Sequence, residues 1–406
     1  MGSSSISRRR FIAASGMAAG ASLLANRAAF GANDRISIGI IGTGSRAGAL
    51  FREIAKLKES HNVTISAVCD VWRPNREKAA KRVEEVFGAK PFATSRFADV
   101  LARDDVDAVV IATPDFGHTP IMIEALKAKK DVYVEKPMSL DVEKANEAVD
   151  LARANACVVQ VGTQRRSEGR WQGAHDFIAS GKLGHVSRID AANNFNHARW
   201  ARNVSDCKEE DVDWEAYLFN REMRPFDPKL LRRWHFYKMC TNGIAGLWLP
   251  HLIDAAHMVM GSTYPRSATA LGGIYVWDDG REHTDTFHAL LDYPEDYLFS
   301  WGMGLGNAAG THYTVHGEHG TIDLEAMTVS DAGGRKKNPD LEGKLDAPSN
   351  QNHMANWVDC MRSRERPNAD IAYGHMHAVA TIMAAEALHT GNRMCYDMEA
   401  RRMYAG

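Results

Sequence analysis

The sequence predicts an α/β protein in which an N-terminal doubly wound parallel sheet precedes a C-terminal α+β domain with a large, mostly antiparallel sheet. Three observations predict this fold class. Between residues 36 and 161, short apolar runs alternate with longer helical patterns, as in parallel sheets covered by helices. After residue 166 the alternation stops and strand-like runs follow one another closely, which favours antiparallel pairing. The length of 406 residues suits two domains better than one.

The composition is that of a folded globular protein, with 45% hydrophobic and 25% charged residues. The 49 basic and 51 acidic residues give a net charge of −2, without the basic excess that is typical of nucleic-acid binders. We therefore expect no nucleic-acid partner. Residues 1–32 contain four arginines and no acidic residue, so 45 basic and 51 acidic residues remain beyond them, a net charge of −6.

The first 32 residues have the pattern of an export signal. Arg8 and Arg9, followed by Phe11, resemble the twin-arginine signal of bacteria. The apolar run at 13–25 is diluted by glycine and serine, and it is shorter than the about 20 residues that a membrane-spanning helix needs. We therefore expect a twin-arginine signal peptide at residues 1–32, a periplasmic or secreted protein, and no membrane anchor. A basic disordered tail is the alternative interpretation.

A glycine-rich turn, GTGSRA, follows the first strand-like run and precedes a helical pattern. In a dinucleotide-binding turn, Gly42 permits the tight bend and Gly44 lets the backbone approach a pyrophosphate. The backbone N–H groups of Ser45 and Arg46, at the start of the following helix, would hold the phosphates. These four residues are our first candidates for cofactor binding.

The next strand-like run, at 63–69, ends at Asp70. An acid at this distance from the glycine turn binds the adenosine ribose hydroxyls in dinucleotide folds. Its carboxylate would repel a 2′-phosphate, so NAD is favoured over NADP. Arg46 and Arg73 keep NADP possible, because either guanidinium could accept that phosphate. The alternative is an ordinary glycine turn with a surface aspartate.

Polar clusters also follow the later strands of this part of the chain. Runs at 106–112, 131–134 and 156–161 end in TPDFGH, EKP and GTQ. Ligands of doubly wound sheets bind at the carboxyl ends of the strands. We therefore predict a dinucleotide-binding Rossmann domain at 33–165. Its remaining helical patterns lie at 119–129 and 142–155.

The order of these motifs resembles the glucose-fructose oxidoreductase and inositol dehydrogenase family, Gfo/Idh/MocA. The match runs from GTGSRA and Asp70 through TPDFGH and VYVEKP to VGTQRR, and EKP is its most specific part. The resemblance implies that Lys136 is catalytic and lies beside the nicotinamide and the reacting hydroxyl. From the residues alone, an ammonium partly buried at a strand end can polarise a substrate oxygen, and a surface lysine is the alternative. The resemblance also implies that the cofactor groove is lined by Thr113, Pro114, His118, Glu135 and Gln164.

The rest of the chain, residues 166–406, is the predicted C-terminal α+β domain for substrate binding and oligomerisation. In the resembled family this sheet forms the subunit interface, which implies a homodimer or homotetramer. Its predicted strands lie at 186–195, 267–277, 284–293, 297–303, 313–315 and 321–324, its helices at 171–180, 354–362 and 373–388, and a surface loop at 330–350.

This second domain carries the histidine that we predict to be catalytic. Pro250 would start a helix in which His251 and Asp254, three residues apart, share one face. Many members of the resembled family have Asp-x-x-x-His-x-x-Asp here, with the histidine as acid and base, whereas this chain has Leu247 in place of the first aspartate. The usual relay partner is therefore missing, which leaves His251 to act with Lys136 or with a carboxylate elsewhere.

An imidazole with a pKa near 6.5 suits proton removal around neutral pH. A buried structural histidine is the alternative interpretation of His251. A metal site with Asp254 and His257 is a further alternative, but the third residue would leave the shared helix face, so we expect no metal.

The aromatic and basic cluster at 232–237 contains Trp234 and His235. These residues can form a sugar platform or pack at a domain junction, and the sequence leaves both open. With Arg165 and Asp254 they are our candidates for substrate binding.

These observations predict an oxidoreductase that acts on secondary hydroxyls of a sugar or glycoside with tightly held NAD. Free dinucleotide is not assured outside the cytoplasm, so the bound cofactor must be regenerated on site. One alternative is a redox-neutral, NAD-dependent glycosidase or epimerase that oxidises a substrate carbon, reacts there and then reduces the product. A non-catalytic sugar-binding protein is the other.

Overall fold

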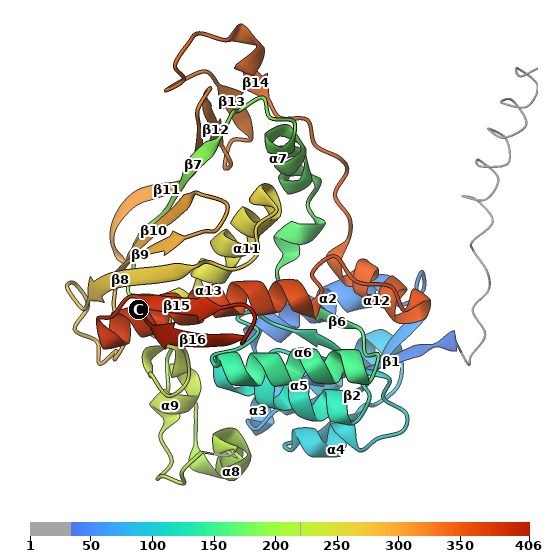
Figure 1. The fold of residues 1–406 in the computed structure, drawn as a ribbon. Helices are drawn as coiled ribbons and strands as arrows, with labels where there is room; N and C mark the ends of the chain where they lie inside the picture. Colours follow the sequence, from blue (N-terminus) through green and yellow to red (C-terminus); the bar gives the residue numbers. More distant parts are fainter. Residues whose placement is uncertain (1–33, 220) are drawn as a thin grey trace, which may run out of the picture. The chain divides into compact units, whose positions relative to one another are not determined.

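The computed structural model describes residues 34–219 and 221–406, and residues 36–406 form one compact unit (Figure 1). This unit contains a six-stranded parallel sheet and a ten-stranded, mostly antiparallel sheet, so the predicted fold class is confirmed. The twin-arginine signal that we predict at 1–32 lies outside the described residues. Within the described ranges, no helix combines the length and the apolar character needed to cross a membrane.

The first sheet has the strand order β3-β2-β1-β4-β5-β6. Its central strands are apolar along their whole length because helices cover both faces: α2, α3 and α12 share one core with the sheet, while α5 and α6 pack on the other side. The strands are β1 (Ile36–Ile41), β2 (Val63–Cys69), β3 (Phe92–Thr94), β4 (Ala108–Ile111), β5 (Asp131–Val134) and β6 (Val159–Val161). The helices are α2 (Ser45–Leu57), α3 (Arg73–Phe87), α4 (Phe97–Leu101), α5 (Asp115–Lys127), α6 (Val142–Ala154) and α12 (His353–Ser363).

The end of the chain returns to complete the core of the first sheet. Helix α12 lies some 190 residues after β6, yet its Trp357 is fully buried against Tyr133 of β5, with ring centroids 5.7 Å apart. The domain boundary that we predict after residue 165 falls in the short 3-10 turn Gln164–Ser167.

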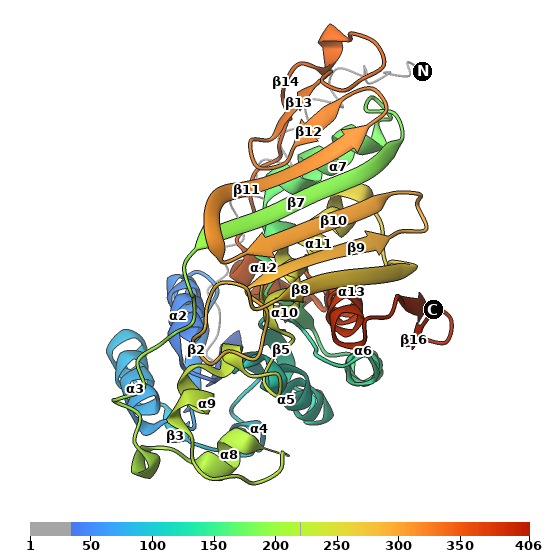
Figure 2. The ribbon, with the colours of Figure 1, turned by 90° about the vertical axis from the view of Figure 1, so that its left-hand side faces the viewer.

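The second sheet has the order β14-β13-β12-β11-β7-β10-β9-β8-β15-β16, and only β7 and β10 pair in parallel. Helices α7, α11 and α13 cover one face, and the other face is open in Figure 2. The strands are β7 (Val186–Asn196), β8 (Ser267–Gly273), β9 (Thr286–Asp292), β10 (Leu298–Gly304), β11 (Gly306–Gly317), β12 (Thr321–Asp323), β13 (Thr328–Ser330), β14 (Gly343–Lys344), β15 (Met394–Asp397) and β16 (Arg402–Ala405). The helices are α7 (Gly169–Ala179), α8 (Trp214–Leu218), α9 (Pro228–Arg232), α10 (Gly243–Leu247), α11 (Leu249–Met260) and α13 (Ile371–Thr390).

Two element boundaries differ from the prediction in ways that matter for the site. Strand β8 ends at Gly273 instead of residue 277, because the N–H groups of Tyr275, Val276 and Trp277 donate to the Asp285 carboxylate and not to a neighbouring strand. Helix α5 begins at Asp115, four residues before the predicted start. Asp115 and His118 therefore lie in the first turn of a helix.

Candidate active site

The glycine turn after β1 has the geometry that the sequence predicts. Gly42 has φ +83°, and a Cβ there would lie 2.8 Å from the backbone of Ala112, so both the conformation and the close approach require glycine. A Cβ at Gly44 would meet no atom within 4 Å, so the space in front of this residue is open. Helix α2 begins at Ser45 without a side-chain cap or an acidic residue in its first turn, which leaves its N–H groups available to an anion.

Asp70 lies directly beside this turn. Its Oδ2 accepts hydrogen bonds from the N–H and the hydroxyl of Thr43, at 2.7 and 2.9 Å, and its Oδ1 accepts from the N–H of Trp72 at 2.9 Å. Burial raises the pKa of this carboxyl, and these bonds oppose the rise. The loop thus presents a carboxylate that is already fixed in position.

The two arginines that kept NADP possible are both paired with carboxylates. Arg46 Nε donates to Glu135 at 2.7 Å, and Arg73 is paired with Asp211. These carboxylates compete with a 2′-phosphate for the two guanidinium groups, which favours NAD.

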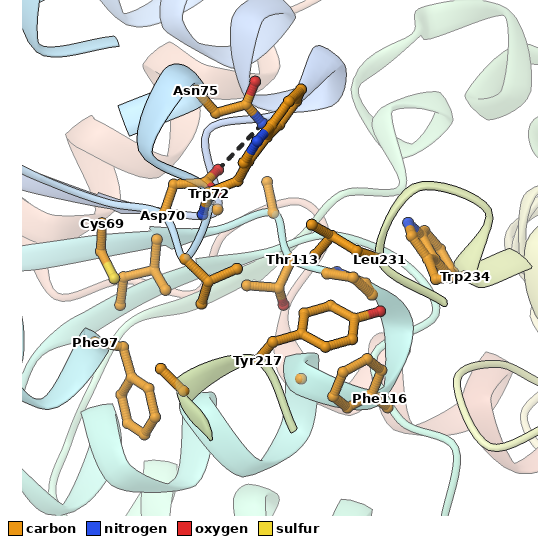
Figure 3. Close-up of a pocket in the computed structure, with 18 of the residues that line it drawn as sticks. Cys69, Asp70, Trp72, Asn75, Phe97, Thr113, Phe116, Tyr217, Leu231 and Trp234 are labelled. Atoms are coloured by element: carbon orange, nitrogen blue, oxygen red, sulfur yellow. Dashed lines mark hydrogen bonds between the residues drawn. The ribbon is translucent and has the colours of Figure 1, made fainter. Parts of the chain in front are cut away.

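A hollow of about 230 Å³ opens between the glycine turn, Asp70 and the loop after β4 (Figure 3). We call it the glycine-loop hollow. The open space at Gly44, the free start of α2 and the fixed carboxylate fit the pyrophosphate and the ribose of a dinucleotide. The predicted cofactor residues that line it are Gly42, Gly44, Ser45, Arg46, Asp70, Thr113 and Pro114.

A segment between β7 and α10 covers this hollow. We define the cover segment as residues 199–219 and 221–240. Figure 3 shows its Tyr217, Leu231 and Trp234 beside the first-domain residues Thr113 and Phe116, and the rings of Phe116 and Tyr217 meet edge to face at 5.5 Å. No residue of this segment was predicted to bind the cofactor, because a covering contact leaves no periodic or motif signal.

Polar contacts and ring contacts hold the cover segment down. Asp213 donates its N–H to the carbonyl of Val71 at 2.9 Å and accepts from the Ser95 hydroxyl at 2.6 Å. Phe219 meets Phe97 at 5.1 Å between ring centroids. The cover segment is therefore anchored to the loops that follow β2 and β3.

A second hollow, of about 320 Å³, contains Lys136 and His251, and we call it the lysine hollow. It shares five lining residues with the glycine-loop hollow, so the two adjoin. The shared residues are Arg46, Ala112, Thr113, Trp234 and His235. Of the remaining cofactor candidates, His118, Glu135 and Gln164 line only the lysine hollow.

Lys136, which follows strand β5, and His251, which lies on helix α11, meet in this hollow. Lys136 Nζ donates to the carbonyl oxygen of Leu247 at 2.6 Å. Burial lowers the pKa of Lys136 and holds that of His251 well below its ordinary value, with Lys136 as the next cause for His251. The His251 ring is therefore a neutral base at neutral pH.

His118 and Gln164 have structural contacts as well as a place in the hollow. The His118 ring nitrogens lie 2.8 Å from the carbonyl oxygen of Pro137 and 3.0 Å from that of Thr113, so the ring ties two strand-end loops together. Gln164 donates from Nε2 to the hydroxyl of Tyr133 at 2.8 Å.

Trp234 and His235 belong to an aromatic stack that also contains Trp200. The Trp234 and His235 ring centroids are 3.6 Å apart, and the Trp200 ring is nearly parallel to His235 at 5.4 Å. All three rings line the lysine hollow, so the stack both packs at the domain junction and presents an aromatic wall.

Two residues that we assigned to the substrate do not line the lysine hollow. Asp254 is 1% exposed, and both of its oxygens accept from Arg166 Nε, at 2.8 and 3.0 Å. Arg165 stacks on Trp171 and donates weakly to the carbonyl of His251 at 3.4 Å. Asp254 is on the buried side of helix α11, and Arg165 contacts the backbone of the same helix at His251. Neither side chain therefore lines the lysine hollow. Within the described residues, no three His, Cys, Asp or Glu side chains group as metal ligands.

Sequence reasoning missed three residues at the other end of the hollow. Arg199 and Trp200 have φ of +47° and +56°, and Trp248 lies under Arg199, whose guanidinium is 4.9 Å from the ring centroid. Two successive non-glycine residues in the left-handed region are uncommon and concentrate at functional sites. Their backbone conformation has no sequence signal.

The carboxylate of Asp115 is a further group of this hollow that was given no role from the sequence. Asp115 was quoted as part of TPDFGH but given no role, and it lines the lysine hollow while only 3% exposed. The signal that could have found it is an acid at a strand's carboxyl end, the same signal that singled out Asp70.

Two family models match this chain. A model described as an oxidoreductase family with an NAD-binding Rossmann fold matches residues 36–163, and the GFO/IDH/MocA C-terminal domain matches residues 215–323.

Three curated relatives illustrate the sequence matches. An uncharacterized oxidoreductase, YdgJ, of Escherichia coli is 29% identical over 53% of this chain and 53% of its own length. A glycosyl hydrolase family 109 protein of Shewanella baltica is 29% identical over 45% of this chain and 40% of its own. An inositol 2-dehydrogenase of Rubrobacter xylanophilus is 32% identical over 38% and 42%. The matches thus span about half the length of these relatives.

Solved structures share the fold over most of the chain. The WlbA dehydrogenase of Bordetella pertussis, in complex with NADH and UDP-GlcNAcA, has a TM-score of 0.68 at 19% identity, covering 90% of this chain and 99% of its own. A levoglucosan dehydrogenase, in complex with NADH and levoglucosan, has a TM-score of 0.65 at 15% identity, covering 88% and 98%. Because the two matching models describe the two halves of one family and together cover more than half of the chain, this protein belongs to the GFO/IDH/MocA family of oxidoreductases, with an NAD-binding Rossmann domain.

Proposed function

We propose that this protein oxidises a secondary hydroxyl of a sugar or glycoside, with NAD that stays bound between turnovers. The observation that carries the proposal is the junction of the two hollows: the dinucleotide-binding space runs directly into a space lined by Lys136 and His251. A cofactor held at Gly44 and Asp70 therefore has its far end beside these two bases.

The residues of the lysine hollow suit alcohol oxidation. NAD, when bound, supplies the hydride acceptor. Lys136 polarises the substrate oxygen, and His251, which is neutral because its pKa is held low, accepts the hydroxyl proton. The carbonyl of Leu247 fixes Lys136 Nζ in the hollow, so the ammonium does not swing away.

A sugar is the substrate class that this hollow fits best. Trp200, Trp234 and Trp248 line it together with Arg199, and flat aromatic walls with a few polar groups suit the apolar faces and the hydroxyls of a pyranose. Relatives and structures named for inositol, levoglucosan and UDP-GlcNAcA point to the same class.

Retention of the cofactor follows from the cover segment. It closes the glycine-loop hollow with aromatic side chains and is anchored at both β2 and β3 loops. Release of a dinucleotide would require these contacts to break, so we expect the cofactor to survive purification.

Export fits a retained cofactor. The motif around Arg8 and Arg9 resembles a signal that carries folded proteins, and a folded protein can take its NAD along. We therefore propose a periplasmic or secreted enzyme with residues 1–32 as the signal.

We also propose that the open face of the second sheet mediates a homodimer or homotetramer. Large apolar side chains are exposed there, including Leu271 at 81% and Leu290 at 45%.

A second candidate function is redox-neutral: the protein would oxidise a ring carbon, eliminate or epimerise at its neighbour, and reduce the product. The relative named as a glycosyl hydrolase family 109 protein favours this candidate, as does a cofactor that cannot leave to be reoxidised.

One experiment separates the candidates. The purified protein is incubated with a panel of glycosides while nicotinamide absorbance and sugar products are followed together. Net reduction indicates a dehydrogenase, and cleavage or epimerisation without net reduction indicates the redox-neutral cycle. If denatured protein releases no dinucleotide and the native protein binds no added NAD, both enzymatic functions are wrong and a sugar-binding protein remains.

A further inference from the structure

The lysine hollow has one carboxylate that no other part of the site neutralises. Among the described residues that line it, only Glu135 and Asp115 are acidic, and Glu135 is committed to Arg46 at 2.7 Å. Among the described residues no arginine or lysine lies within ion-pair distance of Asp115, and the side-chain hydrogen bond found there is accepted by Oδ2 from the Thr241 hydroxyl at 2.7 Å. No described residue donates a hydrogen bond to Oδ1.

Lys136 is a cation in the same hollow that has no carboxylate partner among the described residues. Within the described structure its Nζ bonds only to the neutral carbonyl of Leu247. Arg199 is occupied by the rings of Phe195 and Trp248. Arg199 also lines the hollow without a carboxylate partner among the described residues, but Lys136 is the cation whose charge acts on Asp115.

We propose that Asp115 is a positioning residue whose charge, in the hollow that it shares with Lys136, sets the protonation of Lys136. This inference rests on the proposed function for its chemistry, but it concerns a pair of residues that can be titrated without substrate.

Among the described residues no hydrogen bond or ion pair joins Asp115 to Lys136, so the carboxylate acts on Lys136 through its charge and not by direct proton transfer. An ionised Asp115 keeps Lys136 protonated, and the ammonium polarises the substrate oxygen. His251 accepts the hydroxyl proton, as in the proposed function, while the hydride goes to the bound NAD. In a redox-neutral cycle His251 returns this proton when the substrate is reduced again.

The pKa values of the two groups support this coupling of their charges. Burial raises the pKa of Asp115 to about 7, and Lys136 opposes the rise, whereas burial lowers the pKa of Lys136 and Asp115 opposes the fall. The titratable groups that face Asp115 are Lys136 and Glu135 after β5 and Cys240 before α10. Cys240 has its pKa raised to about 12 by burial, so it stays neutral in this range.

The first test titrates the carboxyl by infrared difference spectroscopy of the purified protein between pH 5 and 9, with no substrate added. We expect a protonated-carboxyl band that is lost around pH 7, is absent in Asp115→Asn and remains in Glu135→Gln, the variant of the other carboxylate in the hollow. A wild-type protein without this band, or one whose band survives in Asp115→Asn, overturns the proposal.

The second test titrates Lys136 by competitive acetylation with acetic anhydride, read by mass spectrometry. Loss of the Asp115 charge should lower the pKa of Lys136, and a shift of half a unit raises the reactive amine fraction about threefold at fixed pH. Equal labelling of Lys136 in wild type and Asp115→Asn contradicts the proposal. Exposed Lys127 is the internal reference in each sample.

Should Asp115→Asn fail to fold, Thr241→Val serves as the second variant, because it keeps the carboxylate and removes its only hydrogen bond. The carboxyl band must then be lost at higher pH, and an unchanged midpoint overturns the proposal. Neither titration uses a sugar. A failed sugar panel with successful titrations therefore rejects only the proposed function, and the reverse result rejects only the role of Asp115.

Discussion

Two buried aspartates, one in each half of the molecule, have side-chain pKa values shifted in opposite directions. Asp115 in the first domain is 3% exposed and has its pKa raised to about 7, whereas Asp254 in the second is 1% exposed and has its pKa held far below the ordinary value. Burial raises the pKa in both cases. The difference is Arg166, which lies at 2.8 Å from Asp254, with His377 as a further positive influence.

The neighbours of a buried carboxylate decide whether it titrates or only stabilises the fold. A buried carboxylate with a fixed guanidinium stays ionised and holds elements together. A buried carboxylate in a hollow, without such a partner, titrates near the pH at which an enzyme works. From the sequence we assigned Asp254 to the substrate and gave Asp115 no role, whereas in the structure Asp115 lines the lysine hollow and Asp254 does not.

The largest expected effect concerns the lysine hollow itself. Lys136→Met and His251→Asn should each reduce the rate of bound-NAD reduction by a glycoside about 10²- to 10⁴-fold. The first variant loses the ammonium that polarises the substrate oxygen, and the second loses the base that accepts the hydroxyl proton. Single-turnover absorbance measures this rate. The matched control is Lys127→Met on the exposed face of α5, which should keep the wild-type rate. Full turnover in both variants would show that the hollow is not the catalytic site.

The next effect belongs to the paired aspartate. Asp254→Asn leaves Arg166 buried without a counter-charge, so the free energy of unfolding should fall by about 3–5 kcal/mol. Urea titration measures this loss. Glu53→Gln, which breaks only the exposed pair with Lys56, should cost at most about 1 kcal/mol. Equal stability of Asp254→Asn and wild type would show that the Asp254–Arg166 pair does not stabilise the fold.

The same pair predicts the acid side of the stability profile. Because the folded-state pKa of Asp254 is lowered, its contribution is complete above the unfolded-state pKa of about 3.9 and is lost as the pH falls toward the folded value. The stability difference between wild type and Asp254→Asn should therefore shrink below about pH 4. A difference that stays constant from pH 7 to pH 3 would contradict the assigned cause.

The smallest effect concerns the hydrogen bond on Asp115. Thr241→Val removes a bond that stabilises the ionised carboxyl, so the pKa of Asp115 should rise above about 7. A bond worth about 1 kcal/mol corresponds to roughly 0.7 of a pKa unit. The infrared midpoint measures this shift. Ser95→Ala, which removes a similar hydroxyl-to-aspartate bond at Asp213 outside the lysine hollow, should leave it in place.

Local patterns were enough to predict the first domain and the strand-end motifs. Apolar runs mark β1, β2, β4, β5 and β6, and the glycine turn with Asp70 follows rules that involve neighbouring residues only. The same is true of Lys136, because its position depends on where one strand ends. The short strands β3, β13, β14, β15 and β16 were missed, since two to four residues leave no usable period.

Contacts between distant segments could not be predicted in this way. The cover segment closes over the glycine-loop hollow through Tyr217 and Phe219, which are more than 100 residues from their ring partners Phe116 and Phe97. Helix α12 completes the first core from the far end of the chain. Neither the order nor the spacing of residues encodes such encounters.

The sequence by itself therefore determined the fold class and the dinucleotide turn, because each depends on backbone periodicity or on a glycine that only one geometry permits. The choice of Lys136 and His251 as the two bases came from the family resemblance. Only the tertiary structure decided which charges are neutralised. It placed Arg166 on Asp254 and Arg46 on Glu135, and among the described residues it placed no basic side chain within ion-pair distance of Asp115. The physical reason is that the protonation of a buried group depends on what lies within a few ångströms of it, and those neighbours come from other parts of the chain.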